Sequence, residues 1–547
     1  MSSPPDPLNA RPRPRAWPAI LALCLIAAVV KAAVITMPPE EISPRGLPQH
    51  EEWRRGMAAQ EWLDGPLVPH LDYQQGHFQG GTLLTIALDA GSFALFGGSP
   101  LTMRLPNVLF DWAMVAFLFL FVDRIASRRA AWIAGLLAAV PSPGYAMVGA
   151  VVWASHVEAN AFAMALLFFW TRHVFGGKDG PWRAFALGAL AGLSLWFHYG
   201  LAVWLAAMLL VELCRDRAAW FRPSMGVRVA GLIAGLLPWW IYNATHDWLG
   251  LGVYGKSAAG HFQTGGEAVT ETFTRLVTHF LPHSLYLPEM GGVGPILEGV
   301  LFVCALAAWG IVSFGAVRAL ARERSVRPEL VLALYPPIWT VLYTFGTFHG
   351  QDWWVSGYRY MLPLHPIAWI SSGIVLARAA APVRIAVVAS LLALFSITTA
   401  TYLRPDHVRI NATAPGHNTE SIGRFLFLRA GEDPETLLSA VDELVDTRDP
   451  LTADVVLFTL GNCLLFGATA VPPPKIQDPE RRAAIEATAR NHRESLRILE
   501  DAVESRFKPY FSELRKDERA YKWPDRRRFW EQWDRRGEPR PSGAYAH

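Results

Sequence analysis

Apolar residues of this chain gather in runs of about 17–25 residues, the length that an α-helix needs to cross a bilayer. Such repeated runs predict an all-α polytopic membrane protein with about eleven transmembrane helices. The predicted spans cover residues 17–37, 104–122, 130–149, 157–173, 183–199, 200–213, 227–245, 294–317, 329–347, 361–378 and 383–403.

One shorter apolar run, from Thr82 to Phe96, is not predicted to cross the membrane. It carries Asp89 and is interrupted by glycine, features that suit a helix lying in the interface or dipping into it. If this run does not cross, the span 104–122 runs inward and delivers the arginines that follow it to the cytoplasm. The distribution of positive charge in membrane proteins favours that arrangement.

Basic residues set the predicted orientation, because short cytoplasmic loops carry an excess of Lys and Arg. The N-terminal tail (1–16) is therefore cytoplasmic, and the transmembrane domain (17–403) exposes a first outer loop (38–103). Further outer segments are 246–293 and the region after 403. The basic residues that fall inside under this count are Arg11, Arg13, Arg15, Arg124, Arg128, Arg129, Arg172, Lys178, Arg183, Arg215, Arg217, Arg222, Arg228, Arg318, Arg322, Arg324, Arg327, Arg378 and Arg384.

Composition supports a membrane protein and argues against several other classes. Of the 547 residues, 52% are hydrophobic, more than the core of a soluble domain needs. The net charge of +3 hides an uneven distribution between loops and indicates no nucleic-acid partner. The four cysteines are widely scattered, so neither a disulfide framework nor a CxxC site is expected.

The last part of the chain, 404–547, is predicted to form a water-exposed domain, largely helical or α+β. Prolines interrupt it repeatedly, and its segments alternate charged and apolar groups. Between Asp478 and Glu518, apolar residues recur at helical spacing, which predicts amphipathic helices. The apolar stretch from Leu451 to Val471 leaves a further crossing open, although its internal polar residues and lack of basic flanks favour a buried strand or helix.

Two carboxylate positions are predicted at the outer ends of spans. Glu51 and Glu52 follow the first span, and Glu158 follows His156 at the start of another. Charged groups at this depth are costly, so each is a candidate for function. They suit removal of a proton from a hydroxyl or, through Glu51 and Glu158, binding of a divalent cation. Simple capping of a helix N-terminus, where the dipole favours a carboxylate, is the structural alternative, and the sequence leaves these roles open.

Basic and aromatic residues at other outer ends point to phosphate. Arg359 stands between Tyr358 and Tyr360 at the entrance of a span, and His198 stands at the end of another. With His156, these residues are the predicted substrate-binding group. The fork of donors on Arg fits phosphate oxygens. An interfacial aromatic belt with a snorkelling Arg, and a structural imidazole at His198, are the alternatives.

Taken together, the ordered segments resemble a known family. Four segments follow the acidic pair in order. Residues 57–65 read Met-Ala-Ala-Gln-Glu-Trp-Leu-Asp-Gly, and residues 95–106 read Leu-Phe-Gly-Gly-Ser-Pro-Leu-Thr-Met-Arg-Leu-Pro. Residues 192–199 read Gly-Leu-Ser-Leu-Trp-Phe-His-Tyr, and residues 359–366 read Arg-Tyr-Met-Leu-Pro-Leu-His-Pro. This order is similar to the GT-C membrane glycosyltransferases, particularly the branch with the protein mannosyltransferases and the aminoarabinose transferase of lipid A. The resemblance covers residues 17–403.

The resemblance implies an outward-facing site that transfers a hexosyl or pentosyl group from a polyprenyl-phosphate donor to an acceptor hydroxyl. It places the family's acidic pair on Glu51 and Glu52, the acid of a later loop on Glu158, and the late Arg-Tyr on Arg359 and Tyr360. It also places a basic position that contacts phosphate on His198, where the family often has Lys. The first acid of the pair, usually Asp in the family, is Glu here.

The implied reaction requires no cofactor, although a divalent cation is compatible with the acidic residues. Lipid, glycan and protein acceptors remain open, and membrane lipid is a further partner. Composition suggests a bacterial inner membrane with the site facing the periplasm, where cell envelope glycosylation takes place. The alternative is a polytopic lipid or solute transporter or flippase, which would more often show repeat symmetry and charges at mid-membrane.

Overall fold

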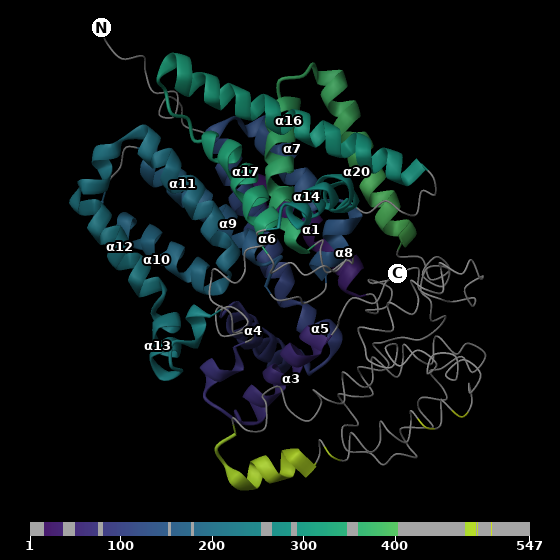
Figure 1. Cartoon of the computed structure of the whole chain (residues 1–547). Helices are drawn as coiled ribbons and strands as arrows, with labels where there is room; N and C mark the ends of the chain where they lie inside the picture. Colours follow the sequence, from purple (N-terminus) through teal and green to yellow (C-terminus); the bar gives the residue numbers. More distant parts are fainter. Residues whose placement is uncertain are drawn as a thin grey trace.

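The computed structural model describes residues 16–36, 50–74, 80–150, 155–176, 180–252, 265–285, 293–346, 359–402 and 476–487, with a few isolated positions beyond them. This described part of the chain consists of helices and their connections, without a β-strand. The prediction of an all-α architecture is confirmed for these residues, which form a helical bundle with a smaller group of helices at one edge (Figure 1).

The helices follow the apolar segments of the sequence. In chain order they are α1 (Trp17–Ile35), α3 (His50–Asp64), α4 (Gly81–Phe96), α5 (Pro100–Arg104), α6 (Pro106–Ile125), α7 (Arg128–Ala139), α8 (Pro143–Ala150), α9 (Ala159–Val174), α10 (Pro181–Phe197), α11 (Ala202–Arg215), α12 (Pro223–Gly235), α13 (Leu237–Thr245), α14 (Gly266–Arg275), α15 (Leu281–His283), α16 (Val293–Glu323), α17 (Leu330–Phe345), α19 (His365–Leu376) and α20 (Ala381–Tyr402). Short 3₁₀ turns include η1 (His70–Tyr73) and η8 (Arg359–Leu364), and a π-helical turn, η6 (Leu276–Phe280), precedes α15.

The chain is a multi-pass membrane protein. Within the described residues, four helical segments are long and apolar enough to cross a bilayer, namely α1, the segment Leu101–Ile125, α16 and α20, and α12 with α13 makes a fifth if this bent pair is one span. Each of the other predicted spans falls on a shorter helix, so the count of about eleven crossings stays a prediction. The segment predicted to lie in the interface forms the helix α4, whose 16 residues are too few for a simple crossing.

Two predicted spans are broken in the structure. The span expected over 130–149 divides into α7 and α8, because Pro141 and Pro143 lack the amide hydrogen that a continuous helix needs at these positions. The span expected over 227–245 bends by 53° between α12 and α13. Pro238, the second residue of α13, accounts for the bend in the same way.

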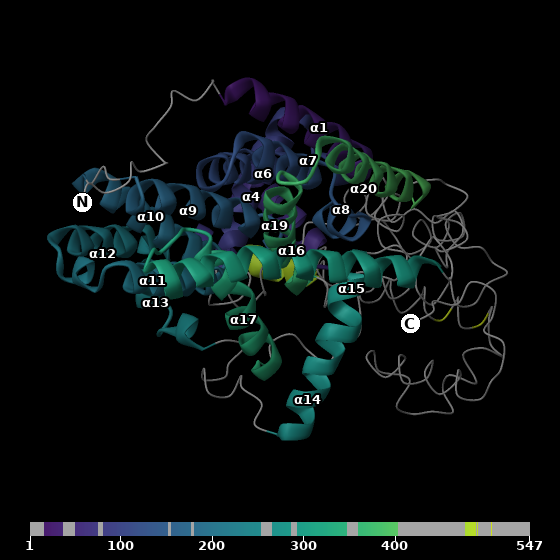
Figure 2. The ribbon, with the colours of Figure 1, turned by 90° about the horizontal axis from the view of Figure 1, so that it is seen from above.

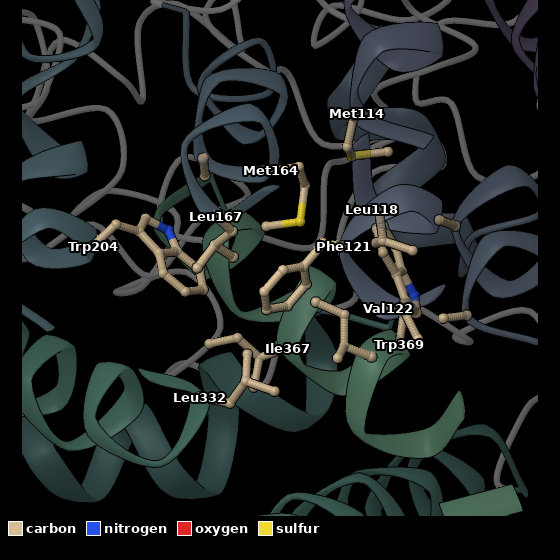
Figure 3. Packing of buried hydrophobic residues seen from close by; sticks show 14 of the residues in the cluster. Met114, Leu118, Phe121, Val122, Met164, Leu167, Trp204, Leu332, Ile367 and Trp369 are labelled. Carbon is tan, nitrogen blue, oxygen red and sulfur yellow. The ribbon is translucent and has the colours of Figure 1, made fainter. Parts of the chain in front are cut away.

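The main core lies among α6, α9, α11, α17 and α19, whose side chains meet in Figure 3. Trp204 of α11 stacks on Tyr335 of α17 with 3.8 Å between ring centroids. Viewed from above, α16 lies along one side of this bundle and α14 projects away from it (Figure 2). In lipid, van der Waals packing rather than exclusion of water holds helices together, so their fit decides stability.

Buried ion pairs also connect the helices of the bundle. Lys31 of α1 lies 2.9 Å from Asp111 of α6 and donates a hydrogen bond of 2.6 Å to the carbonyl of Gly149 in α8. Arg228 of α12 donates to Glu212 of α11 at 2.9 Å. Charges that face the bundle interior and pair with one another are the form in which membrane helices tolerate them.

Glycines allow α10 and α12 to approach each other closely. A Cβ atom at Gly188 or Gly192 of α10 would overlap a backbone carbonyl of α12, and one at Gly231 or Gly235 of α12 would overlap a carbonyl of α10. Each helix carries its two glycines four residues apart, the spacing that lets membrane helices touch along their backbones. This contact fixes α10, the helix that ends just before His198.

The helices α3 and α4 form an outer lobe at the edge of the bundle, below α6 in Figure 1. Ala58 and Ala59 of α3 are buried there against Phe93 of α4. Ile476, from the predicted C-terminal domain, is fully buried in the same cluster and precedes a helix over 479–487. Part of the expected amphipathic region is thus helical, and it docks on the outer lobe; the remainder of 404–547, including Leu451–Val471, lies outside the described residues.

We predict that Gly235→Ala weakens the α10–α12 contact, because its methyl group would meet the carbonyl oxygen of Ala189. The expected loss is on the order of 1–3 kcal/mol, visible as a lower midpoint of thermal unfolding in detergent. Gly310→Ala in α16 is the matched control, since open space surrounds that position. Equal midpoints for the two variants would show that the close approach contributes nothing to stability.

Candidate functional site

The turn Ser155–Glu158, which leads into α9, joins two groups of polar residues. Ser155 has a positive φ of 58°, a conformation that costs energy for a residue with a side chain. Both His156 and Glu158 are buried, at 8% and 1% exposure. Glu158 contacts an arginine of α3, and His156 contacts His198, directly after α10, and Tyr360 of η8. The strained turn therefore carries residues of both halves of the site.

Arg55 of α3 is the centre of the first group. It is 4% exposed and forms a two-pronged ion pair with Asp89 of α4, through Nε and through an Nη2–Oδ1 hydrogen bond of 3.0 Å. Its Nη1 donates to Oε1 of Glu158 at 3.2 Å. One guanidinium thus joins α3, α4 and the turn before α9, and charges buried this deeply persist only when they are paired.

The predicted acidic pair stands one helical turn before this arginine. Glu51 and Glu52 belong to the first turn of α3, four and three residues ahead of Arg55. Residues at these spacings share one side of a helix. The side chains of both glutamates lie outside the described residues, so their predicted role as general base stays a prediction, as does the catalytic role of Glu158.

Two histidines form the second group. Nε2 of His198 lies 3.1 Å from Nδ1 of His156, and the backbone N–H of Gly200 donates to Nδ1 of His198 at 3.0 Å. Both imidazoles lie in connections, one in the turn before α9 and one directly after α10. Burial, followed by the positive charge of Arg359, lowers the pKa of His198 to about 4, and burial, His198 and Arg359 lower that of His156.

Arg359 and Tyr360, at the start of η8, complete this second group. The guanidinium of Arg359 lies 5.1 Å from the ring centroid of Tyr360, and its Nη2 lies 3.3 Å from the phenol oxygen. The same ring meets His156 edge-on at a centroid distance of 5.2 Å. Four of the predicted substrate-binding residues, His156, His198, Arg359 and Tyr360, thus lie together in the structure, whereas Tyr358 lies outside the described residues. Whether these residues bind substrate stays a prediction.

All these residues stand at one end of their helices. His156 precedes α9, His198 follows α10 and Arg359 precedes α19, while arginines occupy the opposite ends of the same helices. Those opposite ends carry Arg172, Arg183 and Arg378. With arginines favouring the cytoplasm, this arrangement agrees with the predicted outward position of the site.

Sequence reasoning missed the roles of Arg55 and Asp89. The signal was present, because an acidic residue within the apolar run 82–96 requires a buried cation, and Arg55 is near it in the first outer loop. The sequence reasoning also passed over Gly80 and Gly81. A Cβ at Gly80 would overlap the ring of Trp196, and the N–H of Gly80 donates to the Trp196 carbonyl at 2.7 Å. These glycines allow the start of α4 to lie against the end of α10, next to His198.

The metal site considered from the sequence is not assembled by the described residues. Among them, no group of three or more His, Cys, Asp or Glu side chains is placed to hold an ion. Oε1 of Glu158 accepts from Arg55, whereas no hydrogen-bond partner among the described residues reaches its buried Oε2. Since the side chain of Glu51 lies outside that set, a cation at Glu51 and Glu158 stays a prediction.

No protein-family model and no curated protein matches the sequence. Among solved structures, the chain is similar to ArnT from Cupriavidus metallidurans bound to undecaprenyl phosphate, with 14% identity and a TM-score of 0.46 over 90% of this chain and 78% of that one. It is also similar to the Archaeoglobus fulgidus oligosaccharyltransferase in complex with Zn and sulfate, with 14% identity and a TM-score of 0.42 over 77% of this chain and 56% of that one. Both are GT-C membrane glycosyltransferases, the kind of protein that the sequence resembles.

We predict that Arg55→Ala destabilises the outer lobe strongly, because it leaves the buried carboxylates of Asp89 and Glu158 without their cation. The expected cost is about 3–5 kcal/mol, the usual effect of breaking a buried ion pair from one side. Thermal unfolding in detergent measures it.

Arg327→Ala is the control for this variant, since Arg327 pairs with Glu323 on the surface, where both side chains are about half exposed. An exposed pair contributes about 0–1 kcal/mol. A similar small shift in both variants would mean that the Arg55 contacts do not hold the lobe.

Proposed function

We propose that this chain is a membrane glycosyltransferase that moves a sugar from a polyprenyl-phosphate donor to an acceptor hydroxyl at the outer face of the membrane. The observation that carries this proposal is the meeting of His156, His198 and the Arg359–Tyr360 pair, from three distant parts of the sequence, at one end of their helices. The resemblance of the ordered sequence segments to GT-C glycosyltransferases supports the same reaction. A bacterial inner membrane, with the site toward the periplasm, is the proposed location.

Arg359 provides the positive charge that a leaving phosphate needs. As the bond between the anomeric carbon and the phosphate oxygen breaks, its electron pair stays on the polyprenyl phosphate, where negative charge grows. A preorganised guanidinium stabilises such charge most effectively in a site from which water is largely excluded. The stacking of Arg359 on Tyr360 holds the guanidinium in place while leaving its edge to donate hydrogen bonds.

Glu51 or Glu52 serves as the general base. In the proposed step the carboxylate takes the proton of the acceptor hydroxyl. The hydroxyl oxygen of the acceptor bonds to the anomeric carbon on the face opposite the phosphate. The Arg55–Glu158 contact fixes α3 beside the turn that carries His156. The acidic pair and the basic group are thus held on neighbouring elements, as a displacement between them requires, and the step requires no cofactor.

We predict that Glu51→Gln or Glu52→Gln reduces turnover by roughly two to four orders of magnitude, the contribution of a positioned general base. The measurement is release of free polyprenyl phosphate by the detergent-purified protein from a panel of polyprenyl-phosphate sugars, with total membrane lipid and glycan extract as a source of acceptors. If the wild-type protein releases polyprenyl phosphate from one donor and a variant does not, that donor also identifies the sugar.

Glu267→Gln is the matched control, because Glu267 is an exposed carboxylate in the first turn of α14. It is expected to keep full turnover. Full turnover in both acidic-pair variants would remove the general-base assignment. Transport of an intact polyprenyl-phosphate sugar across vesicles, without cleavage, would instead favour the flippase alternative.

We predict that Arg359→Ala mainly weakens handling of the donor. Loss of a charge-assisted hydrogen bond to phosphate costs about 1.5–3 kcal/mol, which corresponds to a KM for the donor raised roughly 10- to 100-fold. Steady-state kinetics with varied donor concentration test it, and Arg318→Ala, on the exposed cytoplasmic end of α16, is the control. An unchanged KM and unchanged turnover for Arg359→Ala would contradict the assignment.

A further inference from the structure

The hydrogen bonds around the two histidines have a fixed direction. The N–H of Gly200 is a donor only, so Nδ1 of His198 must accept and carries no proton. A neutral His198 then has its proton on Nε2, and this N–H donates to Nδ1 of His156 across 3.1 Å. The proton positions follow from the hydrogen-bond partners, beginning at a backbone amide whose direction cannot be reversed.

The same reasoning fixes the tautomer of His156. Its Nδ1 accepts from His198, so the proton of the neutral ring lies on Nε2, on the side away from His198. No hydrogen bond within the described part of the chain reaches that nitrogen. His156 consequently presents one N–H donor of known position, while both nitrogens of His198 are already engaged.

His156 and the cation of the site lie against the same tyrosine. His156 and Arg359 both pack on the ring of Tyr360, with distances of 5.2 Å and 5.1 Å to its centroid. Two such donors, one neutral and one charged, suit a tetrahedral group with several acceptor oxygens. A phosphate has this shape, and a neutral acceptor such as a sugar hydroxyl would not need the cation.

We propose that His156, through Nε2–H, donates to a phosphate oxygen of the polyprenyl-phosphate donor beside Arg359, and that His198 is a positioning residue that does not touch the donor. This proposal rests on the proposed function and deepens it. It reassigns the phosphate contact that the sequence resemblance places on His198.

Binding of undecaprenyl phosphate to the detergent-purified full chain tests the proposal, with undecaprenol as the probe that lacks the phosphate. His156→Ala is expected to weaken binding of undecaprenyl phosphate roughly 10- to 100-fold, the effect of losing a hydrogen bond to a charged group. Binding of undecaprenol should stay within about two-fold of wild type, since the polyprenyl chain does not depend on this donor. A variant that simply misfolds would lose both ligands.

Glutamine variants separate the two roles, because the Gln amide places an N–H donor near the position of Nε2. His156→Gln should restore most of the affinity for undecaprenyl phosphate. His198→Gln should also restore what His198→Ala loses, since it can still donate to Nδ1 of His156. The double variant His156→Ala/His198→Ala should bind no more weakly than His156→Ala alone, as expected if His198 acts only through its neighbour.

Gly200→Ala tests the start of the chain of hydrogen bonds without changing either histidine. A Cβ at Gly200 would lie 2.8 Å from the His198 ring, so the imidazole must move away from its amide partner. We expect weaker binding of undecaprenyl phosphate and unchanged binding of undecaprenol.

The outcomes distinguish this proposal from the proposed function. Wild-type affinity in His156→Ala, or additive losses in the double variant, would overturn the assignment of the donor while leaving the glycosyltransferase in place. No binding of undecaprenyl phosphate by the wild-type protein, together with no release from any donor, would overturn both.

Discussion

The pairing of one buried guanidinium with two buried carboxylates organises the helices around the candidate site. Arg55 binds Asp89 and Glu158, which belong to α4 and to the turn before α9. Taking each of these charges out of water costs several kcal/mol, so the two carboxylates are tolerated only while Arg55 is in place. The arrangement of α3, α4 and the turn is for this reason cooperative, and the position of His156 in that turn depends on it.

The site combines two electrostatic environments within a few residues. On one side of the turn Glu158 remains close to a permanent positive charge; on the other, His156 and His198 remain neutral because burial and Arg359 oppose a further proton. The two histidines thus form hydrogen bonds of fixed direction, and Arg359 carries the positive charge of the site.

The sequence located most of the helical segments and named most residues of the polar group. Apolar runs located the segments of helix, and the positive-inside rule placed His156, His198 and Arg359 at one side of the membrane. The sequence was insufficient where contacts between distant segments determine which side chains meet. That Asp89 pairs with Arg55 depends on how α4 lies against α3, which no local pattern specifies. The breaks at Pro141 and Leu236 were readable from proline but were outweighed by the apolar runs around them.

The burial of Ile476 within the outer lobe bears on how the protein is made. Ile476 packs in the same cluster as Ala58 and Tyr73, residues synthesised far earlier, before most of the helices are inserted. Because the ribosome delivers the chain from its N-terminus, this cluster stays open until the C-terminal region that carries Ile476 has been made. The lobe that carries the acidic pair is therefore completed last, so a partly inserted chain would not yet hold its site together.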